Sequence, residues 1–189
     1  MSNMSKRKCI LLIGGARSGK SRYAQDWAQK SGKSVLFVAT AEARDDEMKR
    51  RIEAHRQDRP HGWQTLEAPD HISAQISANL GNAEVVIVDC ITLLMNNVFN
   101  LYPEGTAAAV IEETGLREIR ELVTCISSTD ATFVIVTNEV GMDVVPPTEL
   151  GRIYRDMLGR ANQLLAECAD EVLFMVAGIP VRIKPSLNL

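Results

Sequence analysis

Eight residues near the start of the chain have the types and spacing of a phosphate-binding loop. They read Gly14-Gly15-Ala16-Arg17-Ser18-Gly19-Lys20-Ser21 and satisfy the pattern GxxxxGK[ST] in full. Glycines let the backbone turn tightly, so that its N–H groups point toward phosphate oxygens. We expect Lys20 to reach the β- and γ-phosphates of a nucleoside triphosphate and the Ser21 hydroxyl to bind Mg²⁺. A glycine-rich turn without a ligand is disfavoured, because the loop follows an apolar run and opens a helical pattern.

A second candidate ligand stands at the end of another apolar run. The segment Val85-Val86-Ile87-Val88-Asp89 reads as a buried strand that brings a carboxylate to its C-terminal end. In open α/β sheets ligands bind at that edge, and a carboxylate there can hold Mg²⁺ directly or through water. An ordinary aspartate in a turn would look the same on its own. The assignment of Asp89 as a metal and nucleotide ligand therefore depends on the phosphate loop.

His55 is a candidate nucleophile within a charged helical stretch. Met48, Ile52 and His55 have helical spacing and share one face, and the two apolar members suggest that this face looks inward. Positive charge nearby comes from Arg51, Arg56 and Arg59. Such charge favours the neutral, nucleophilic imidazole and suits a triphosphate. From these residues alone, a helix-surface histidine packed against Ile52 is the favoured explanation and a nucleophile is the alternative.

Short apolar runs that must position these side chains alternate with longer amphipathic stretches. The runs show little polar alternation, as in strands covered on both faces. The expected strands are Cys9–Ile13, Val35–Ala39, Val85–Val88, Phe133–Val136 and Val172–Val176, with Trp63–Leu66 as a weaker candidate and Val181–Lys184 as an antiparallel edge strand. The expected helices are Gly19–Lys30, Asp45–Gln57, His71–Asn79, Ala107–Ser127 and Glu149–Ala169. This order predicts an α/β, P-loop NTPase-like fold with a mainly parallel sheet and helices on both faces.

The segment Asn96–Gly105 is the least regular part of the chain. We expect it to be a flexible loop or a subunit contact.

Composition and charge narrow the function classes. The chain has 189 residues, 46% of them hydrophobic, and a net charge of -3. These values fit a single P-loop nucleotide-binding domain over residues 1–189, with 1–7 as a flexible leader. Without a broad cationic face, nucleic acid is not an expected partner. No apolar run approaches the roughly 20 residues that span a bilayer, and none fits a signal-peptide core, so we expect a cytoplasmic protein without stable membrane insertion.

Cysteine usage agrees with a cytoplasmic location. The four residues are Cys9, Cys90, Cys125 and Cys168. Their wide spacing matches no metal-ligand pattern, and they lie in or beside apolar segments. We expect reduced, mostly buried thiols.

Several longer segments make the sequence resemble the bifunctional adenosylcobinamide kinase / adenosylcobinamide-phosphate guanylyltransferases of cobalamin biosynthesis. These segments are GGARSGKSRYA (14–24), VATAEARDDEMKRRIEAHRQDRP (38–60), DCITLLMNN (89–97), VTNEVGMDVVP (136–146) and GRANQLLAECADEVLFMVAGIPVRIK (159–184). The resemblance implies that the aminopropanol hydroxyl of adenosylcobinamide is phosphorylated and that GMP is then moved from GTP onto that phosphate, with release of pyrophosphate. It also implies ATP, GTP, adenosylcobinamide and its phosphate as partners, Mg²⁺ as cofactor, and a homotrimer.

The resemblance also implies roles for individual residues. His55 stands at the position of a guanylylated histidine, which reverses the preference for a surface histidine. Its imidazole would attack the α-phosphorus while Lys20, Mg²⁺ and the loop amides hold the departing pyrophosphate. Glu67 would accept two hydrogen bonds from the N1/N2 edge of guanine; a solvated surface glutamate is the plainer explanation. The nucleotide-binding positions outside the loop fall on Thr40, Ala41, Glu42, Arg56, Gln57, Asp58, Arg59, Glu67 and Asp89.

Two other functions fit parts of the sequence. A small-molecule P-loop kinase without guanylyl transfer would use Lys20, Ser21 and Asp89 and would leave His55 without a role. A GTP-operated switch would read guanine through an NKxD-type motif after a strand, where this chain has Thr137-Asn138-Glu139-Val140. The missing lysine and aspartate disfavour the switch. The loop that begins at Asn138 and Glu139 lies at the same expected sheet edge, and the pattern assigns it no specific role.

Overall fold

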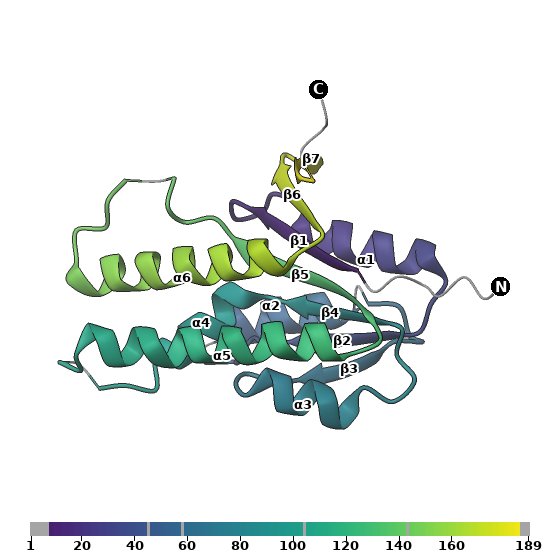
Figure 1. The fold of residues 1–189 in the computed structure, drawn as a ribbon, viewed down its shortest axis with the longest axis horizontal. Coiled ribbons are helices and arrows are strands. Elements are labelled where there is room, and N and C mark those ends of the chain that lie inside the picture. Colours follow the sequence, from purple (N-terminus) through teal and green to yellow (C-terminus); the bar gives the residue numbers. More distant parts are fainter. Residues whose placement is uncertain (1–7, 45, 58, 104, 143, 186–189) are drawn as a thin grey trace.

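One seven-stranded sheet forms the centre of the computed structural model, which describes residues 8–185 apart from 45, 58, 104 and 143 (Figure 1). Its strands are β1 (Cys9–Gly14), β2 (Val35–Ala39), β3 (Gln64–Glu67), β4 (Val85–Asp89), β5 (Thr132–Asn138), β6 (Glu171–Val176) and β7 (Ile179–Lys184). They lie in the order β3-β2-β4-β5-β1-β6-β7, and only the β6–β7 pair is antiparallel. The predicted mainly parallel sheet with an antiparallel edge strand is confirmed.

The apolar runs form strands because both faces of the sheet are covered. All five residues of β2 are buried, and successive side chains point to opposite faces. Leu36 and Val38 belong to one apolar layer, whereas Val35 and Phe37 belong to the other. A strand without polar alternation is therefore stable here, as the sequence pattern predicted.

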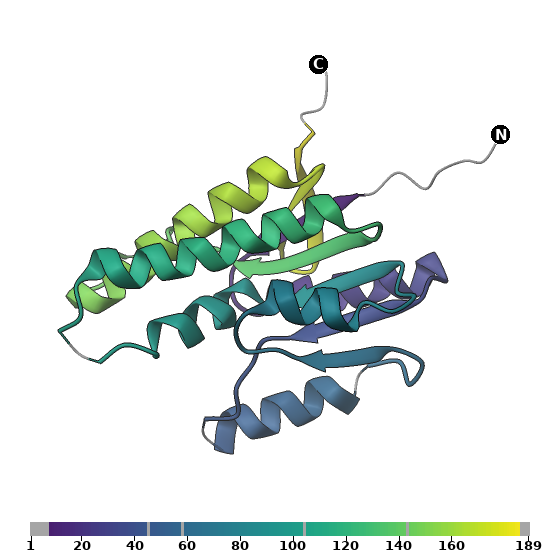
Figure 2. The same cartoon turned by 60° about the horizontal axis from the view of Figure 1, so that its bottom comes forward.

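The described part of the chain contains six helices. They are α1 (Lys20–Ser31), α2 (Asp46–Gln57), α3 (Ile72–Asn79), α4 (Ile91–Phe99), α5 (Ala108–Ser128) and α6 (Glu149–Cys168). Buried residues of α3 to α6 fill one apolar layer, and Ala24 and Ala28 of α1 pack into the other. The long helices α5 and α6 lie side by side (Figure 2). Helices on both faces are thus confirmed, with the heavier cover on one of them.

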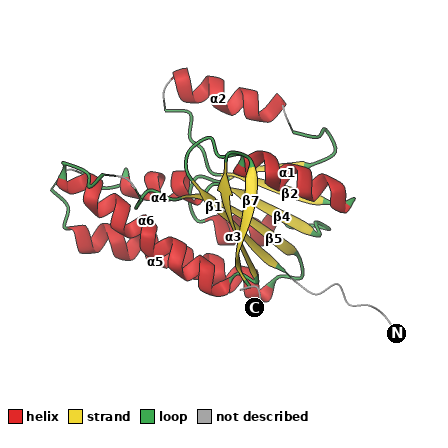
Figure 3. Cartoon of the chain, turned by 90° about the horizontal axis from the view of Figure 1, so that it is seen from above, coloured by secondary structure: helices red, strands yellow, loops and turns green. Residues whose placement is uncertain are grey.

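Helix α2 differs from the others because it stands away from the sheet, joined by a connection at each end (Figure 3). Two of its residues, Met48 and Ile52, are partly buried, as expected for the inward face of the helix. Most other described side chains of α2 are exposed. Helix α2 therefore packs little against the rest of the fold.

The prediction of an irregular segment over Asn96–Gly105 is partly wrong. Its first four residues belong to α4, which the sequence pattern did not identify as a helix. The pair Asn96-Asn97 interrupts the apolar pattern, yet Asn97 is only 5% exposed because backbone carbonyls bind its amide group. The proposed subunit contact by this segment stays a prediction.

The structure also bears on the predicted element boundaries, the cysteines and the absence of a membrane-spanning helix. The boundaries of the predicted strands and helices shift by only one or two residues. The four cysteines are free thiols, three of them buried. No helix within the described residues has the length and apolar character needed to cross a membrane. The predicted leader at residues 1–7 lies outside the described residues, and the cytoplasmic location stays a prediction.

Candidate active site

The phosphate loop connects β1 to α1, with Gly14 ending the strand and Lys20 beginning the helix. The turn between β6 and β7 packs directly against it: the Gly178 N–H donates to the Ser18 carbonyl over 2.9 Å. Gly19 has a φ of 94°, and a Cβ there would lie 3.0 Å from the Gly178 Cα. Both the conformation and the close approach require glycine at position 19.

A second contact holds the other end of the loop. The Gly14 carbonyl accepts a hydrogen bond from the Glu139 N–H over 3.1 Å. The neighbouring Asn138 is itself fixed, because its N–H donates to Thr92 Oγ1 and its carbonyl accepts from Asn162 Nδ2. The segment that begins at Asn138, whose role the sequence left open, thus supports the phosphate loop from β5.

Lys20 is buried at the base of the loop. Its ammonium donates to the carbonyls of Gly14 and Gly15 over 2.9 and 2.7 Å. Burial lowers the pKa of Lys20, while the nearby Cys90 and Asp89 act in the opposite direction. The structure therefore brings Lys20 within electrostatic reach of Asp89. The sequence predicted phosphate binding for Lys20 and metal binding for Asp89.

Thr40 joins the end of β2 to the end of β4. Its hydroxyl donates to the Cys90 carbonyl over 2.7 Å and accepts from the Cys90 N–H over 2.8 Å. Its own N–H donates to the Asp89 carbonyl. Thr40 is fully buried, so the hydroxyl group serves to fix the backbone around Asp89. Nucleotide binding by Thr40, which the resemblance implied, stays a prediction.

A cavity of about 400 Å³ separates this sheet edge from α2. The sheet side contributes mainly small and apolar residues, and α2 contributes long polar ones. Its lining is Phe37, Ala39, Ala41, Ala43, Lys49, Ile52, Glu53, Arg56, Arg59, Glu67, Asp89 and Leu93. Five residues predicted to bind nucleotide, namely Ala41, Arg56, Arg59, Glu67 and Asp89, therefore line one cavity.

Arg59 covers an aromatic wall of the cavity. Its guanidinium carbon lies 4.0 Å from the centre of the Phe37 ring, which also stacks on Trp63. Burial lowers the pKa of Arg59, Asp89 raises it and Arg56 lowers it further, but a guanidinium stays charged under all ordinary conditions. The Arg59 Nε is buried without a hydrogen-bond partner among the described residues. This wall offers both a flat apolar surface and a positive charge.

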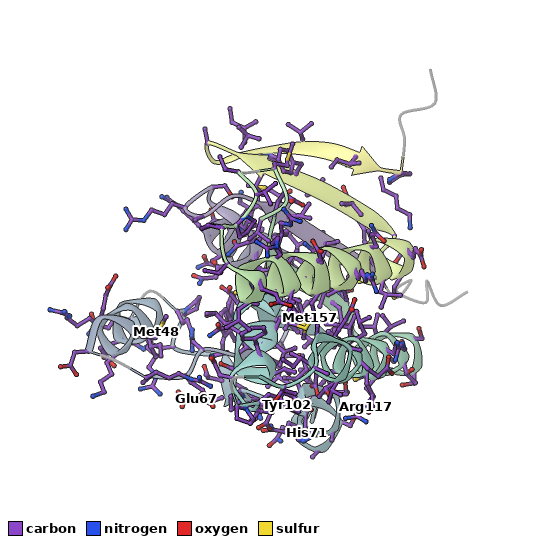
Figure 4. The ribbon with its side chains drawn as sticks, turned by 90° about the vertical axis from the view of Figure 1, so that its left-hand side faces the viewer. Met48, Glu67, His71, Tyr102, Arg117 and Met157 are labelled. Carbon is purple, nitrogen blue, oxygen red and sulfur yellow. The ribbon has the colours of Figure 1, made fainter. Side chains whose placement is uncertain are left out.

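Glu67 is the last residue of β3 and lies between α2 and the rest of the molecule in Figure 4. Its carboxylate pairs with the guanidinium of Arg56 on α2. Both side chains are about half exposed, and exposed pairs of this kind contribute at most about 1 kcal/mol. The Glu67 carboxylate can therefore exchange Arg56 for another donor at little cost.

The remaining predicted residues lie elsewhere or outside the described residues. The Glu42 carboxylate pairs with Arg44, and the Gln57 side chain donates to Glu53. Ser21 follows Lys20 in the first turn of α1, while Gly15, Ala16 and Arg17 form the exposed part of the phosphate loop. His55 belongs to α2, but its side chain, like all of Asp58, lies outside the described residues.

Comparison with known proteins decides the family. The family model described as cobinamide kinase / cobinamide phosphate guanyltransferase matches residues 10–183. The chain belongs to this family. It is therefore an enzyme of the kinase and nucleotidyltransferase type.

Three curated relatives agree with this assignment. The chain is 43% identical to the bifunctional adenosylcobalamin biosynthesis protein CobU of Escherichia coli over 93% of its length and 99% of that protein. It is 41% identical to CobU of Salmonella typhimurium over the same shares, and 40% identical to CobP of Pseudomonas aeruginosa over 92% of this chain and 96% of that one. Among solved structures, a RadB recombinase superimposes with a TM-score of 0.49 at 14% identity, over 88% of this chain and 73% of that one.

Replacement of Lys20 by alanine is expected to lower phosphoryl and guanylyl transfer about 100-fold or more, because one positive contact to the β- and γ-phosphates is lost. Initial rates with ATP and with GTP measure the effect, and circular dichroism verifies the fold. Lys30→Ala, at an exposed position of the same helix, is the matched control. Near-normal turnover by a folded Lys20→Ala protein would rule out this role.

Proposed function

We propose that this protein phosphorylates the aminopropanol hydroxyl of adenosylcobinamide with a nucleoside triphosphate. It then transfers GMP from GTP to the resulting phosphate, giving adenosylcobinamide-GDP and pyrophosphate. The observation that carries the proposal is the cavity between the phosphate-loop edge and α2, in a chain that matches a cobinamide kinase / cobinamide phosphate guanyltransferase family over residues 10–183. The names of the three relatives, all called bifunctional, support two activities in one chain.

Phosphoryl transfer requires a bound triphosphate and an aligned hydroxyl, with no covalent protein intermediate. The loop amides and Lys20 bind the β- and γ-phosphates and stabilise the charge that develops on them. Ser21 and Asp89 offer the oxygen ligands that Mg²⁺ prefers, and Asp89 lines the cavity at this edge of the sheet. Bound Mg²⁺ would neutralise phosphate charge at this position.

Guanylyl transfer proceeds in two displacements. In the first, a nitrogen of His55 attacks the α-phosphorus of GTP, a P–N bond forms, and the bond to pyrophosphate breaks. In the second, a phosphate oxygen of adenosylcobinamide phosphate attacks the same phosphorus and the P–N bond breaks, which frees the histidine. Ile52 and Arg56, on either side of His55 along α2, line the cavity, and this supports the assignment of the helix to the reaction.

Guanine recognition is assigned to the end of β3. The Glu67 carboxylate accepts hydrogen bonds from the N1 and N2 groups of guanine, which adenine does not offer in the same arrangement. Arg56 leaves the carboxylate when the base binds and becomes available to a phosphate. The Phe37 ring and the Arg59 guanidinium provide a flat surface for a base or a positive charge for a phosphate.

Replacement of His55 by alanine is expected to abolish guanylyl transfer and to leave phosphorylation of adenosylcobinamide within about threefold of wild type, because only the first reaction needs a protein nucleophile. Each step is measured separately, with adenosylcobinamide and ATP for one and adenosylcobinamide phosphate and GTP for the other. His61→Ala, at an exposed position beyond Pro60, is the matched control.

Two results would contradict this assignment. Guanylyl transfer by His55→Ala at the wild-type rate would show that His55 is not the nucleophile. A wild-type protein that phosphorylates its acceptor but never transfers GMP would establish the small-molecule kinase instead.

We also propose a homotrimer, as the family resemblance implies. Ile179, Val181 and Ile183 alternate along the edge strand β7, so they share one face, and each is more than half exposed. Exposed apolar side chains in a row on an edge strand mark a surface that another chain covers. The apolar side chains of Met142, Val144 and Val145 form a second exposed group in the loop before α6.

Light scattering coupled to size-exclusion chromatography is expected to give three times the 20.8 kDa mass of one chain. Val181→Glu introduces a charge on β7 and should shift the protein toward single chains. Val110→Glu, at an equally exposed position on α5, is the comparison variant. A single-chain mass for the wild type at micromolar concentration would refute the trimer.

A further inference from the structure

Asn97 ties together the ends of two neighbouring strands at the candidate site. Its Nδ2 donates to the carbonyl of Thr40, which follows β2, over 2.8 Å. The same nitrogen donates to the carbonyl of Pro69, two residues beyond β3, over 2.9 Å. The residue is only 5% exposed and lies on α4; its bond to Thr40 is buried and its bond to Pro69 is partly buried.

The two carbonyls need such a partner because the β-ladder ends just before them. The last ladder-like bond runs from the Ala68 N–H to the Ala39 carbonyl, after which the two chains diverge. A buried carbonyl without a donor costs about 1–3 kcal/mol. The amide of asparagine supplies two N–H donors from one nitrogen. Aspartate would supply none when ionised, and serine supplies one.

These bonds extend the chain of contacts from β3 to β4, whose last residue is Asp89. Thr40 bonds to Asp89 and Cys90 through its N–H and hydroxyl, and Asn97 connects Thr40 to Pro69. Pro69 stands two residues beyond Glu67. Backbone pairing to β2 holds Glu67 itself, and the Asn97 side chain fixes the chain just beyond it relative to the phosphate-binding edge.

We propose that Asn97 is a positioning residue that sets the preference of this site for guanine over adenine. It contacts no base itself; it holds the β3 end at the distance from the phosphate loop that a bound guanine nucleotide spans. The inference rests on the proposed recognition of guanine at the end of β3. When the Pro69 bond is lost, the β3 end moves relative to the loop, and contacts to the base weaken while contacts to the phosphates remain.

Calorimetric titration with GDP and with ADP tests this role. Asn97→Ser retains one donor, and we expect its dissociation constant for GDP to rise about tenfold, the factor that corresponds to one lost hydrogen bond. The dissociation constant for ADP should change less than twofold. A purely structural role would instead weaken both nucleotides equally, or neither. Equal changes in both constants, or no change, would overturn the proposal, as would a wild-type protein without a preference for GDP.

Asn162→Ser is the matched control. Asn162 is as deeply buried as Asn97, and its side chain also bonds to the backbone, but it serves β5 through the Asn138 carbonyl. Its replacement should lower the melting temperature to a similar extent and leave the ratio of the two dissociation constants at the wild-type value. A loss of GDP preference in this control equal to that of Asn97→Ser would show that general destabilisation is the cause, and would also overturn the proposal.

A second variant of Asn97 and a variant of Glu67 complete the test. Asn97→Ala removes both N–H donors without placing a negative charge against the two carbonyls, so it tests GDP preference if Asn97→Ser does not fold. Titration of Glu67→Gln in the same way separates the positioning role of Asn97 from base recognition by Glu67. If Glu67→Gln loses GDP preference and the folded Asn97 variant keeps it, the role of Asn97 is refuted. If the Asn97 variant loses it and Glu67→Gln does not, the positioning role stands and Glu67 is not the residue that reads the base.

Discussion

The structure depends on one constraint, the need to satisfy backbone polar groups where parallel strands end. Within the sheet, every buried strand pairs with its neighbours; at the carboxyl edge that pairing stops while the chain is still buried. The protein resolves this with side chains and loops that bond to the last carbonyls. Lys20 donates to the carbonyls of Gly14 and Gly15. Thr40 donates to the carbonyl of Cys90, and Asn97 donates to the carbonyl of Thr40. The same edge is thereby rich in fixed polar groups, which is what a triphosphate requires.

The phosphate loop and helix α2 differ in how firmly the rest of the structure holds them. The phosphate loop is bounded by Gly178 on one side and Glu139 on the other, so its amides are held in place before any ligand arrives. Across the cavity, α2 contributes exposed charged side chains, and its link to the sheet through Arg56 and Glu67 is a half-exposed ion pair. A preorganised phosphate loop with an easily exchanged ion pair across the cavity suits an enzyme of the kinase and nucleotidyltransferase type.

Spacing rules recovered the parts of the site that follow directly from backbone geometry. The phosphate loop, Asp89 at the end of β4 and the order of strands and helices could all be predicted, because each is a local pattern attached to a buried strand. Asn97 could not, since its partners Thr40 and Pro69 lie 57 and 28 residues away and its polar side chain made a buried helix look like a loop. Thr40 was predicted as a ligand, but its hydroxyl has a backbone role that only the fold reveals. The pairing of Arg56 with Glu67 likewise joins two elements that no sequence period connects.

We propose that α2 supplies the nucleophile for guanylyl transfer, at a phosphate-loop site that also carries out phosphorylation. The most direct test of this proposal is to incubate the wild-type protein with GTP and no acceptor, digest it under neutral conditions, and locate any added GMP by tandem mass spectrometry. GMP is expected on His55, lost on brief acid treatment and lost also when adenosylcobinamide phosphate is added before digestion. A protein that forms adenosylcobinamide-GDP at full rate while the peptide containing His55 stays unmodified, or that carries GMP on another residue, would contradict it.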